Sequence, residues 1–251
     1  LHSAVAPLAA AAGELVAPAP PDDAELLGLL AFDEGAGAIA RDSGGNGHDA
    51  SLEGTPQWSA GKVGGALQFG SGSHVVDEDA EDYLNGLEAL TISMWIKAGA
   101  TGTDTGFLIA KDPTDQDNSI SMRYDASGAS FGGNNVLKVA VTTDNGEQQL
   151  ESSGNRQSTE WQHVCMTWSS GALLRLYLDG TEDVPTGRNN ANNTGPVSTC
   201  EKLIIGKGGK DVINGAGWGG LIDGVPFYGR ALAAEEVMWL AGRTQPVYKP
   251  L

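Results

Sequence analysis

The residues best suited to chemistry are oxygen-bearing side chains in glycine-rich stretches. Residues 41–54 (RDSGGNGHDASLEG) bring Asp42, Asn46, His48 and Asp49 together among several glycines. Glycine lets the backbone fold tightly, so side-chain and carbonyl oxygens can converge on one point, and hard cations such as calcium bind to several oxygens at once. A turn held by side-chain hydrogen bonds to its own backbone would have the same spacing. On local spacing alone the ordinary turn is favoured, and cation binding is the alternative.

A second carboxylate with a special environment is Asp223, in the stretch 217–237 (GWGGLIDGVPFYGRALAAEEV). This stretch predicts a short strand, a turn at Gly229 and one or two helical turns. Alternation along a strand places Asp223 on the same face as Val225 and Phe227, the residues best suited to a core. Burying a carboxylate is costly unless it has a partner. We therefore expect Asp223 to lie at the rim, to accept backbone N–H groups or to bind a cation.

Catalytic patterns are weaker than these. Glycosidases use a pair of carboxylates, but in the acidic stretch 76–82 (VDEDAED) Glu78 and Asp79 are adjacent and would point to opposite faces of a strand. We expect it to be a solvated loop. The four histidines are scattered, and His163 reads as a strand residue rather than a general base. The sequence favours a binding protein over an enzyme, and leaves open a lyase or glycosidase site assembled from distant loops.

Aromatic side chains near loops could stack on the apolar faces of sugar rings. The candidates for such a ligand-binding surface are Trp58, Tyr83, Tyr124, Phe131 and Trp218. Residues 112–118 (DPTDQDN) are expected to form a solvated hairpin tip, with cation binding by Asp115 and Asp117 as the alternative.

Cys165 and Cys200 are the only cysteines. Each lies in or beside an apolar, strand-like run, so the two could meet across a sheet. An even number of cysteines in a protein expected outside the cell favours a disulfide, and two buried free thiols are the alternative. A zinc site is not expected, because the C-x-x-C spacing is missing.

Composition narrows the class of partner. The chain has 251 residues with 32 acidic and 15 basic side chains, and its net charge of −17 repels phosphate backbones and anionic membranes. Nucleic acid is therefore not an expected partner. No apolar run has the length needed to span a bilayer.

The pattern of the chain predicts an all-β fold. Its 36 glycines, its Asn-Gly and Asp-Gly turns and its short apolar runs favour many strands joined by tight turns. Residues 91–99 (TISMWIKAG) alternate clearly, and residues 160–168 and 173–180 predict a hairpin. We expect a two-sheet antiparallel β-sandwich, a jelly roll, with one short C-terminal helix.

The first 25 residues differ from the rest. Residues 1–25 are rich in Ala and Pro and predict a linker or arm, followed by one domain over residues 26–251. They have no initial Met and no basic region typical of an intact signal peptide. As an alternative, the stretch Glu14 to Ala17 adds a strand to this sandwich or to a neighbouring molecule, which would give self-association through the arm.

A resemblance to a known family rests on motifs in order along the chain: FDEG, DSGGNG, GKVGGALQF, TISMWIK, EWQHV, LYLDG, LIIGK and GLIDGVPFYGRALAAEE. The series resembles the laminin-G-like, concanavalin A-like jelly-roll domains of secreted bacterial proteins. The resemblance implies two curved antiparallel sheets and a structural calcium ion. Carried onto this chain, it implies Asp42, Asn46, a carbonyl near His48, and Asp223 as calcium ligands.

Two departures from the family pattern carry expectations of their own. Gly224 and Pro226 replace residues of the last strand, so this strand should be locally irregular. Ala233 stands where a Ser often caps the helix; Glu235 and Glu236 should partly compensate. Together the residues and the resemblance predict a secreted or cell-surface recognition module, calcium-stabilised and binding carbohydrate or acting in adhesion. A self-assembling structural subunit that binds other proteins is the alternative, and a polysaccharide-cleaving enzyme is the second alternative.

Overall fold

A computed structural model describes residues 13–70, 72–111, 118–126, 134–184, 193–208, 217–243 and 247–250. Phe131, Asp115 and Asp117 lie outside the described residues, so the expectations for them have no structural outcome.

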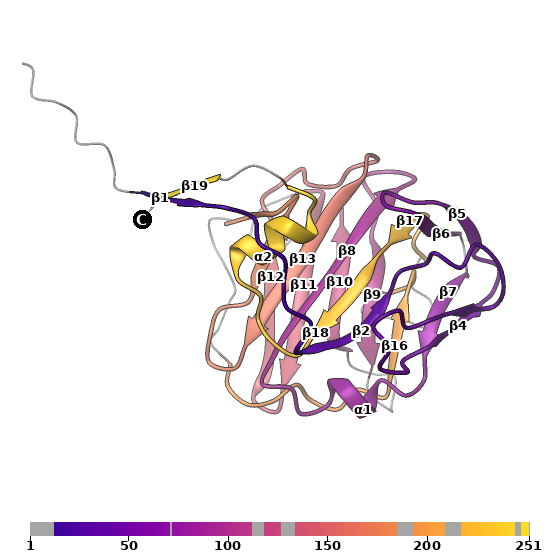
Figure 1. The fold of residues 1–251 in the computed structure, drawn as a ribbon, viewed down its shortest axis with the longest axis horizontal. Helices are drawn as coiled ribbons and strands as arrows, with labels where there is room; N and C mark the ends of the chain where they lie inside the picture. The colour runs from indigo at the N-terminus through magenta and orange to yellow at the C-terminus, as the bar shows by residue number, and fades with distance from the viewer. Residues whose placement is uncertain are drawn as a thin grey trace, which may run out of the picture.

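The described chain forms two packed antiparallel sheets (Figure 1). One has eight strands in the order β12-β11-β10-β9-β16-β7-β4-β3. The other has nine, in the order β15-β14-β13-β8-β17-β6-β5, with β18 paired to β8 and β2 paired to β18. The strands are β1 Gly13–Val16, β2 Leu26–Leu30, β3 Ile39–Ala40, β4 Ala50–Glu53, β5 Gln57–Ala60, β6 Gly65–Phe69, β7 His74–Asp77, β8 Ala89–Ala98, β9 Thr105–Lys111, β10 Asn118–Asp125, β11 Val136–Thr143, β12 Gly146–Glu151, β13 Gln162–Ser169, β14 Arg175–Leu178, β15 Thr181–Glu182, β16 Lys202–Ile205, β17 Gly220–Asp223, β18 Val225–Tyr228 and β19 Val247–Pro250. The helices are α1 Glu81–Leu84 and α2 Ala234–Leu240. The predicted sandwich with a short C-terminal helix is confirmed.

The main core lies between the two sheets. Strand β8 shows why: Ile92, Met94 and Ile96 alternate inward and are fully buried, as strand periodicity predicts. Aromatic rings fill one part of this core, where Trp218 packs edge-on against Tyr124 and Phe107 with centroid distances of 5.3 and 5.4 Å. Edge-to-face packing of this kind adds to the apolar burial.

A smaller core lies on the other face of the nine-stranded sheet, under α2. Its buried members are Cys165, Tyr177, Tyr228, Leu232 and Val237. At the start of α2, the Ala233 N–H donates to Glu236 Oε2 at 2.8 Å, so the glutamate supplies half of a capping box that Ala233 itself cannot complete.

The predicted disulfide is wrong, because both cysteines are free and buried. Cys165 points to the α2 side of the nine-stranded sheet, whereas Cys200 belongs to the core between the sheets. In β13, Val164 and Met166 on either side of Cys165 take the core-facing positions. One-residue alternation therefore turns the Cys165 side chain away from Cys200.

The last strand is irregular, as Gly224 and Pro226 led us to expect. Gly224 has φ of +56°, a conformation that glycine adopts readily, and it divides the strand into β17 and β18. Ile222 pairs with Ile96 in the core register, so Asp223 pairs with Trp95 on the opposite face. The expectation that Asp223 shares a face with Val225 and Phe227 is wrong, because the break at Gly224 shifts the alternation by one residue.

The segments near the two ends pair with each other outside the sandwich. Strand β1 runs antiparallel to β19 in a separate two-stranded sheet, which we call the ribbon. Figure 1 shows it beside α2, pointing away from the main sheets.

No helix among the described residues has the length and apolar character needed to cross a bilayer.

Candidate functional site

A hydrogen-bonded surface feature is built on the loop after β3, with Asp42 at its centre. Oδ1 of Asp42 accepts the backbone N–H groups of Leu29 at 2.8 Å and Gly44 at 2.9 Å. Oδ2 accepts those of Asn46 at 2.7 Å and His48 at 3.4 Å. Partial burial acts to raise the pKa of Asp42, but the four N–H groups outweigh it and hold the pKa below its ordinary value. The carboxylate therefore organises the loop in its charged form.

Contacts between aromatic rings connect the same loop to the core. The ring of His48 lies 4.0 Å from the ring of Tyr83, which in turn contacts Phe227 of the core edge-on at 6.4 Å. The Tyr83 hydroxyl donates to Asp77 Oδ2 at 2.9 Å. Burial raises the pKa of Tyr83, and the Asp77 charge raises it further, so the phenol stays protonated. The loop is thus anchored to the core through two stacked rings.

The loop also covers the free edge of β2. Ser43 N–H donates to the Leu29 carbonyl at 2.7 Å, and Asn46 Nδ2 donates to the Leu26 carbonyl at 3.0 Å. Covering an edge with a loop prevents it from pairing with another chain. Backbone pairing on one side and the Asp42 contacts on the other leave little freedom to residues 42–48.

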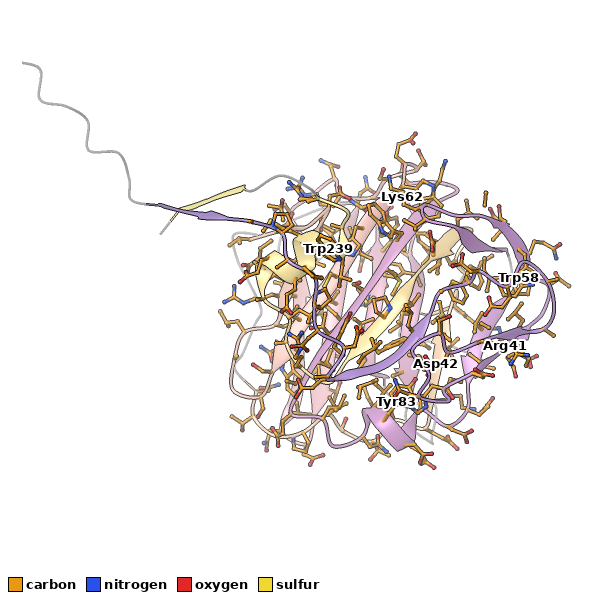
Figure 2. All side chains as sticks on the ribbon, in the orientation of Figure 1. Arg41, Asp42, Trp58, Lys62, Tyr83 and Trp239 are labelled. Carbon is orange, nitrogen blue, oxygen red and sulfur yellow. The ribbon has the colours of Figure 1, made fainter. Side chains whose placement is uncertain are left out.

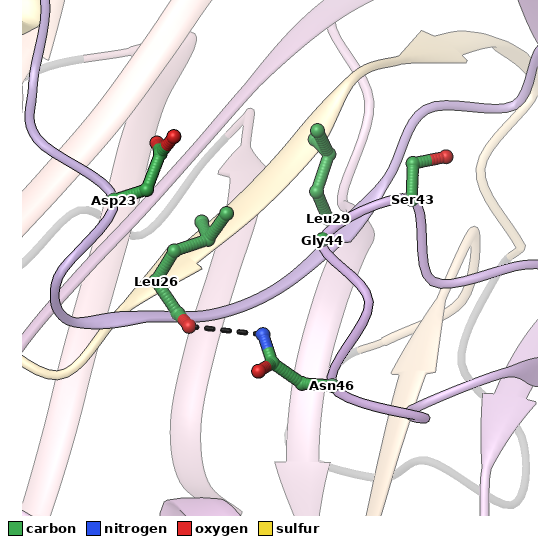
Figure 3. A pocket seen from close by; sticks show the side chains of 6 residues that line it. All are labelled: Asp23, Leu26, Leu29, Ser43, Gly44 and Asn46. Atoms are coloured by element: carbon green, nitrogen blue, oxygen red, sulfur yellow. Dashed lines mark hydrogen bonds between the residues drawn. The ribbon is translucent and has the colours of Figure 1, made fainter.

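Between this loop and β2 lies a hollow of about 260 Å³. Its lining residues are Asp23, Leu26, Leu29, Ser43, Gly44 and Asn46 (Figure 3). Leucine side chains and a mixed set of polar groups meet here, with the Asn46 amide held in place by its bond to Leu26. We call this feature the β2 hollow.

The surroundings of the β2 hollow are acidic. Asp23 lies in its lining. Nearby, Arg230 pairs with Asp22 at 3.4 Å and with Glu25 at 3.8 Å, and it binds Glu236 at 2.7 Å. Arg230 is therefore already paired with carboxylates. Asp42 adds a further negative charge beside the hollow.

Asp223 serves a different loop from Asp42. Its Oδ2 accepts the N–H groups of Lys62 at 2.7 Å and Val63 at 2.8 Å, in the turn between β5 and β6. Asp33 Oδ1 accepts the Gly65 N–H at 2.5 Å, directly after this turn at the start of β6. Burial raises the pKa of Asp223 to about 6; the two N–H groups oppose this rise, and the Asp33 charge adds to it.

The predicted calcium ligands do not converge in the structure. Asp42, Asn46 and His48 share one loop, but Asp223 has its hydrogen bonds in the β5–β6 turn. Within the described ranges, no group of three or more His, Cys, Asp and Glu side chains is placed to hold a metal ion. A single ion shared by Asp42 and Asp223 therefore does not fit this arrangement. Calcium binding at one of the two loops stays a prediction of the family resemblance.

Two of the predicted stacking platforms are core residues. Tyr124 and Trp218 are each 1% exposed and belong to the main core between the sheets. Neither offers a ring face to a ligand. Trp58 is half-buried, and its Nε1 donates to the Gly37 carbonyl at 3.0 Å. Tyr83 is half-buried in the stack described above.

One exposed aromatic residue was not among the stacking candidates drawn from the sequence. Trp239 is 50% exposed on α2, and Figure 2 labels it together with Trp58, which lies at the β5 edge. Val237 and Leu240 pack against the smaller core, and the position of Trp239 beside them in the helical period is the signal that could have identified it as exposed. The hollow itself had no such signal, because Asp23, Leu26 and Leu29 meet Ser43 and Gly44 only through tertiary contact.

Residues considered for catalysis have structural roles. His163 is buried on β13, and burial lowers its pKa to about 3, so the ring is neutral. The acidic stretch 76–82 is only partly a solvated loop. Asp77 is buried in β7 and binds Tyr83, and Glu81 and Asp82 begin α1.

Comparison with solved structures supports the same fold. Domain 4 of AbnA, an extracellular arabinanase from Geobacillus stearothermophilus solved with arabinotriose, has a TM-score of 0.63 at 22% identity, covering 86% of this chain and 98% of that one. The binding domain of Paraclostridial Mosquitocidal Protein 1 has a TM-score of 0.65 at 17% identity, covering 87% and 52%. The binding domain of botulinum neurotoxin DC in complex with SialylT has a TM-score of 0.62 at 14% identity, covering 89% and 52%. This chain thus spans about half of each toxin binding domain.

Sequence comparison gives the family. Among curated proteins no sequence matches significantly. A family model described as the concanavalin A-like lectin/glucanases superfamily matches residues 69–238, more than half of the chain. The matched region runs from the end of β6 to α2 and so includes most of both sheets. The chain belongs to the concanavalin A-like lectin/glucanase superfamily.

Proposed function

We propose that this protein is a recognition module that binds a neutral glycan in the β2 hollow. The observation that carries the proposal is the hollow itself, where two leucines and three polar side chains converge on a loop held rigidly by Asp42. A binding site on a braced loop loses little freedom when its ligand binds.

The lining suits a sugar ring. A pyranose or furanose has apolar C–H faces, which Leu26 and Leu29 can contact, and hydroxyl groups, which Ser43, Asn46 and Asp23 can bind. The volume of about 260 Å³ lies just below that of drug-sized pockets, so it suits one sugar residue of a chain rather than a long segment.

Charge selects the class of glycan. The lining includes Asp23, the protein carries a net charge of −17, and the nearby Arg230 is neutralised by its carboxylate partners. Like charges repel an acidic sugar on approach. Neutral or amino sugars should therefore bind better than uronic or sialic acids.

The structural relatives agree with glycan recognition as a class. The arabinanase domain was solved with arabinotriose, and one toxin domain was solved with SialylT. We also propose that the chain works outside the cell, in line with the extracellular arabinanase. Adhesion through protein contacts is the second candidate function, because β1 pairs only with β19 among the described residues and its other edge can accept a strand.

Glycan-array screening followed by calorimetry tests the proposal. Ser43 is exposed at the hollow, so Ser43→Trp should fill it and reduce binding of the best neutral glycan at least tenfold. Thr101→Trp is the matched control. It places the same side chain at an exposed position after the C-terminal end of β8 and should leave affinity unchanged. The proposal fails if no neutral glycan binds, or if both variants bind like the wild type.

A further inference from the structure

The ribbon consists of two strands, and each has a second edge on which no described strand lies. Strand β1 pairs with β19 along one edge only, with Gly13 opposite Pro250 and Val16 opposite Val247. Among the residues that the structure describes, no third strand joins this sheet. An isolated two-stranded sheet is marginally stable in water, and its open N–H and C=O groups can pair with another strand.

Two contacts of the segment that follows β1 fix the direction in which the ribbon leaves the sandwich. Ala19 N–H donates to the Glu235 carbonyl of α2 at 3.1 Å, and Asp22 pairs with Arg230. These contacts hold the chain beside α2 just after it leaves β1, and Figure 1 shows the ribbon pointing away from the sandwich at that point. The strand pair is thus presented where a second molecule can reach it.

The two edges of the ribbon are not equivalent. Strand β19 contains Pro250, which has no N–H to donate and is typical of blocked edges. Strand β1 has the sequence GELV, in which every residue has an N–H. The open edge of β1 is therefore the better template for another strand.

Charge distribution indicates what can approach this edge. Glu14 and Lys249 are the only Asp, Glu, Lys or Arg residues in 1–21 and 244–251, so the remaining residues, 22–243, have 31 acidic and 14 basic side chains and carry the whole net charge of −17. Two copies of so acidic a body repel each other over most of their surfaces. The ribbon is the part of the molecule where two copies can approach without that repulsion.

From these observations we infer that the ribbon joins two copies of this chain. The β1 edges pair antiparallel around a two-fold axis and form a four-stranded sheet in the order β19-β1-β1-β19 between the two bodies. Identical edges pair in this way in symmetric dimers, and main-chain hydrogen bonds supply the contact. The dimer places two β2 hollows on one assembly, so a polymeric glycan could engage both.

Sedimentation velocity over a wide range of concentrations tests the inference with the full chain. The wild type should reach about twice the monomer mass of 25.9 kDa as concentration rises. Deleting residues 1–16 should keep the protein at the monomer mass, and Leu15→Pro, inside β1, should weaken association at least tenfold. Ala17→Pro is the matched control just outside the strand and should associate like the wild type.

Each variant is checked for an intact body by its melting temperature, which should equal that of the wild type because the ribbon lies outside the sandwich. Cross-linking distinguishes the edges: Leu15→Cys should form disulfide-linked dimers faster than Val247→Cys, with no background from the buried Cys165 and Cys200. A wild type that stays monomeric overturns the inference, as does a deletion variant that still dimerises. Equal cross-linking rates would overturn the pairing through β1, and glycan binding by a monomeric variant leaves the function proposed above intact.

Discussion

Asp223→Asn is expected to stabilise the protein at neutral pH. Asp223 is 3% exposed, and burial raises its pKa from 3.8 to about 6. A carboxyl group whose pKa is raised on folding binds its proton more tightly in the folded protein than in the unfolded chain. The free energy of unfolding therefore falls as pH rises between these two pKa values, and above pH 6 the charge destabilises the fold.

The magnitude follows from the size of the shift. A rise of about 2 pKa units corresponds to about 3 kcal/mol, at about 1.36 kcal/mol per unit. Asparagine keeps an oxygen that can accept the Lys62 and Val63 N–H groups but has no charge to bury. The stability of Asp223→Asn relative to the wild type should thus increase by about 3 kcal/mol between about pH 4 and about pH 7.

Urea denaturation of both proteins at a series of pH values measures this difference, and taking the difference removes the contributions of the other carboxylates. Asp223→Ala is the control, because it removes the acceptor as well as the charge and should be less stable than Asp223→Asn by about 1 to 3 kcal/mol at every pH. The reasoning is refuted if Asp223→Asn is less stable than the wild type at neutral pH by an amount that does not vary with pH. A cation bound at Asp223 would produce that result, so the series is repeated with a chelator.

The other predictions concern the loop, the core, the thiols and the metal. Asp42→Ala should lower the free energy of unfolding by roughly 2 kcal/mol, because four backbone N–H groups lose their acceptor. In the wild type the pKa of Asp42 lies below its ordinary value, so this contribution to stability is lost as pH falls through that pKa. An unchanged unfolding curve for Asp42→Ala would contradict the prediction. Trp218→Ala should cost about 3 to 5 kcal/mol as a core truncation, whereas Trp58→Ala, at a half-buried position, should cost less; equal losses would show that Trp218 is not packed as described. Both thiols should resist alkylation in the folded protein and react when it unfolds. A reductant should not change the melting temperature. A measured mass two hydrogens lower than that of the reduced chain would show a disulfide instead. The family resemblance predicts that EDTA lowers the melting temperature, and because Asp42 and Asp223 serve separate loops, only one of Asp42→Ala and Asp223→Ala should remove the response.

Local sequence patterns were enough to predict most of the fold. Alternation in residues 91–99 predicted the inward face of β8 correctly, because the period of a strand is two and one face is buried. Gly224 and Pro226 predicted the irregular last strand, since each residue has a specific backbone effect. The motifs in order predicted the superfamily, which the match over residues 69–238 shows.

The site was harder to predict because it depends on contacts between distant segments. Asn46 was a candidate from its glycine-rich loop, but its neighbours in the hollow, Leu26 and Leu29, come from a strand that reads as ordinary core. Trp218 and Tyr124 lie next to loops in sequence, yet their rings are buried between the sheets. Sequence distance from a loop does not say which way a side chain points.

Asp42 and Asp223 show the difference between the two levels. From the sequence alone, both are acidic residues in glycine-rich stretches, and that much determined that each would need backbone N–H groups or a cation. Only the tertiary structure decided that Asp42 organises the loop over β2 and that Asp223 holds the β5–β6 turn. The physical reason is the break at Gly224, which shifts the strand by one residue and turns the Asp223 carboxylate to the opposite face of the sheet.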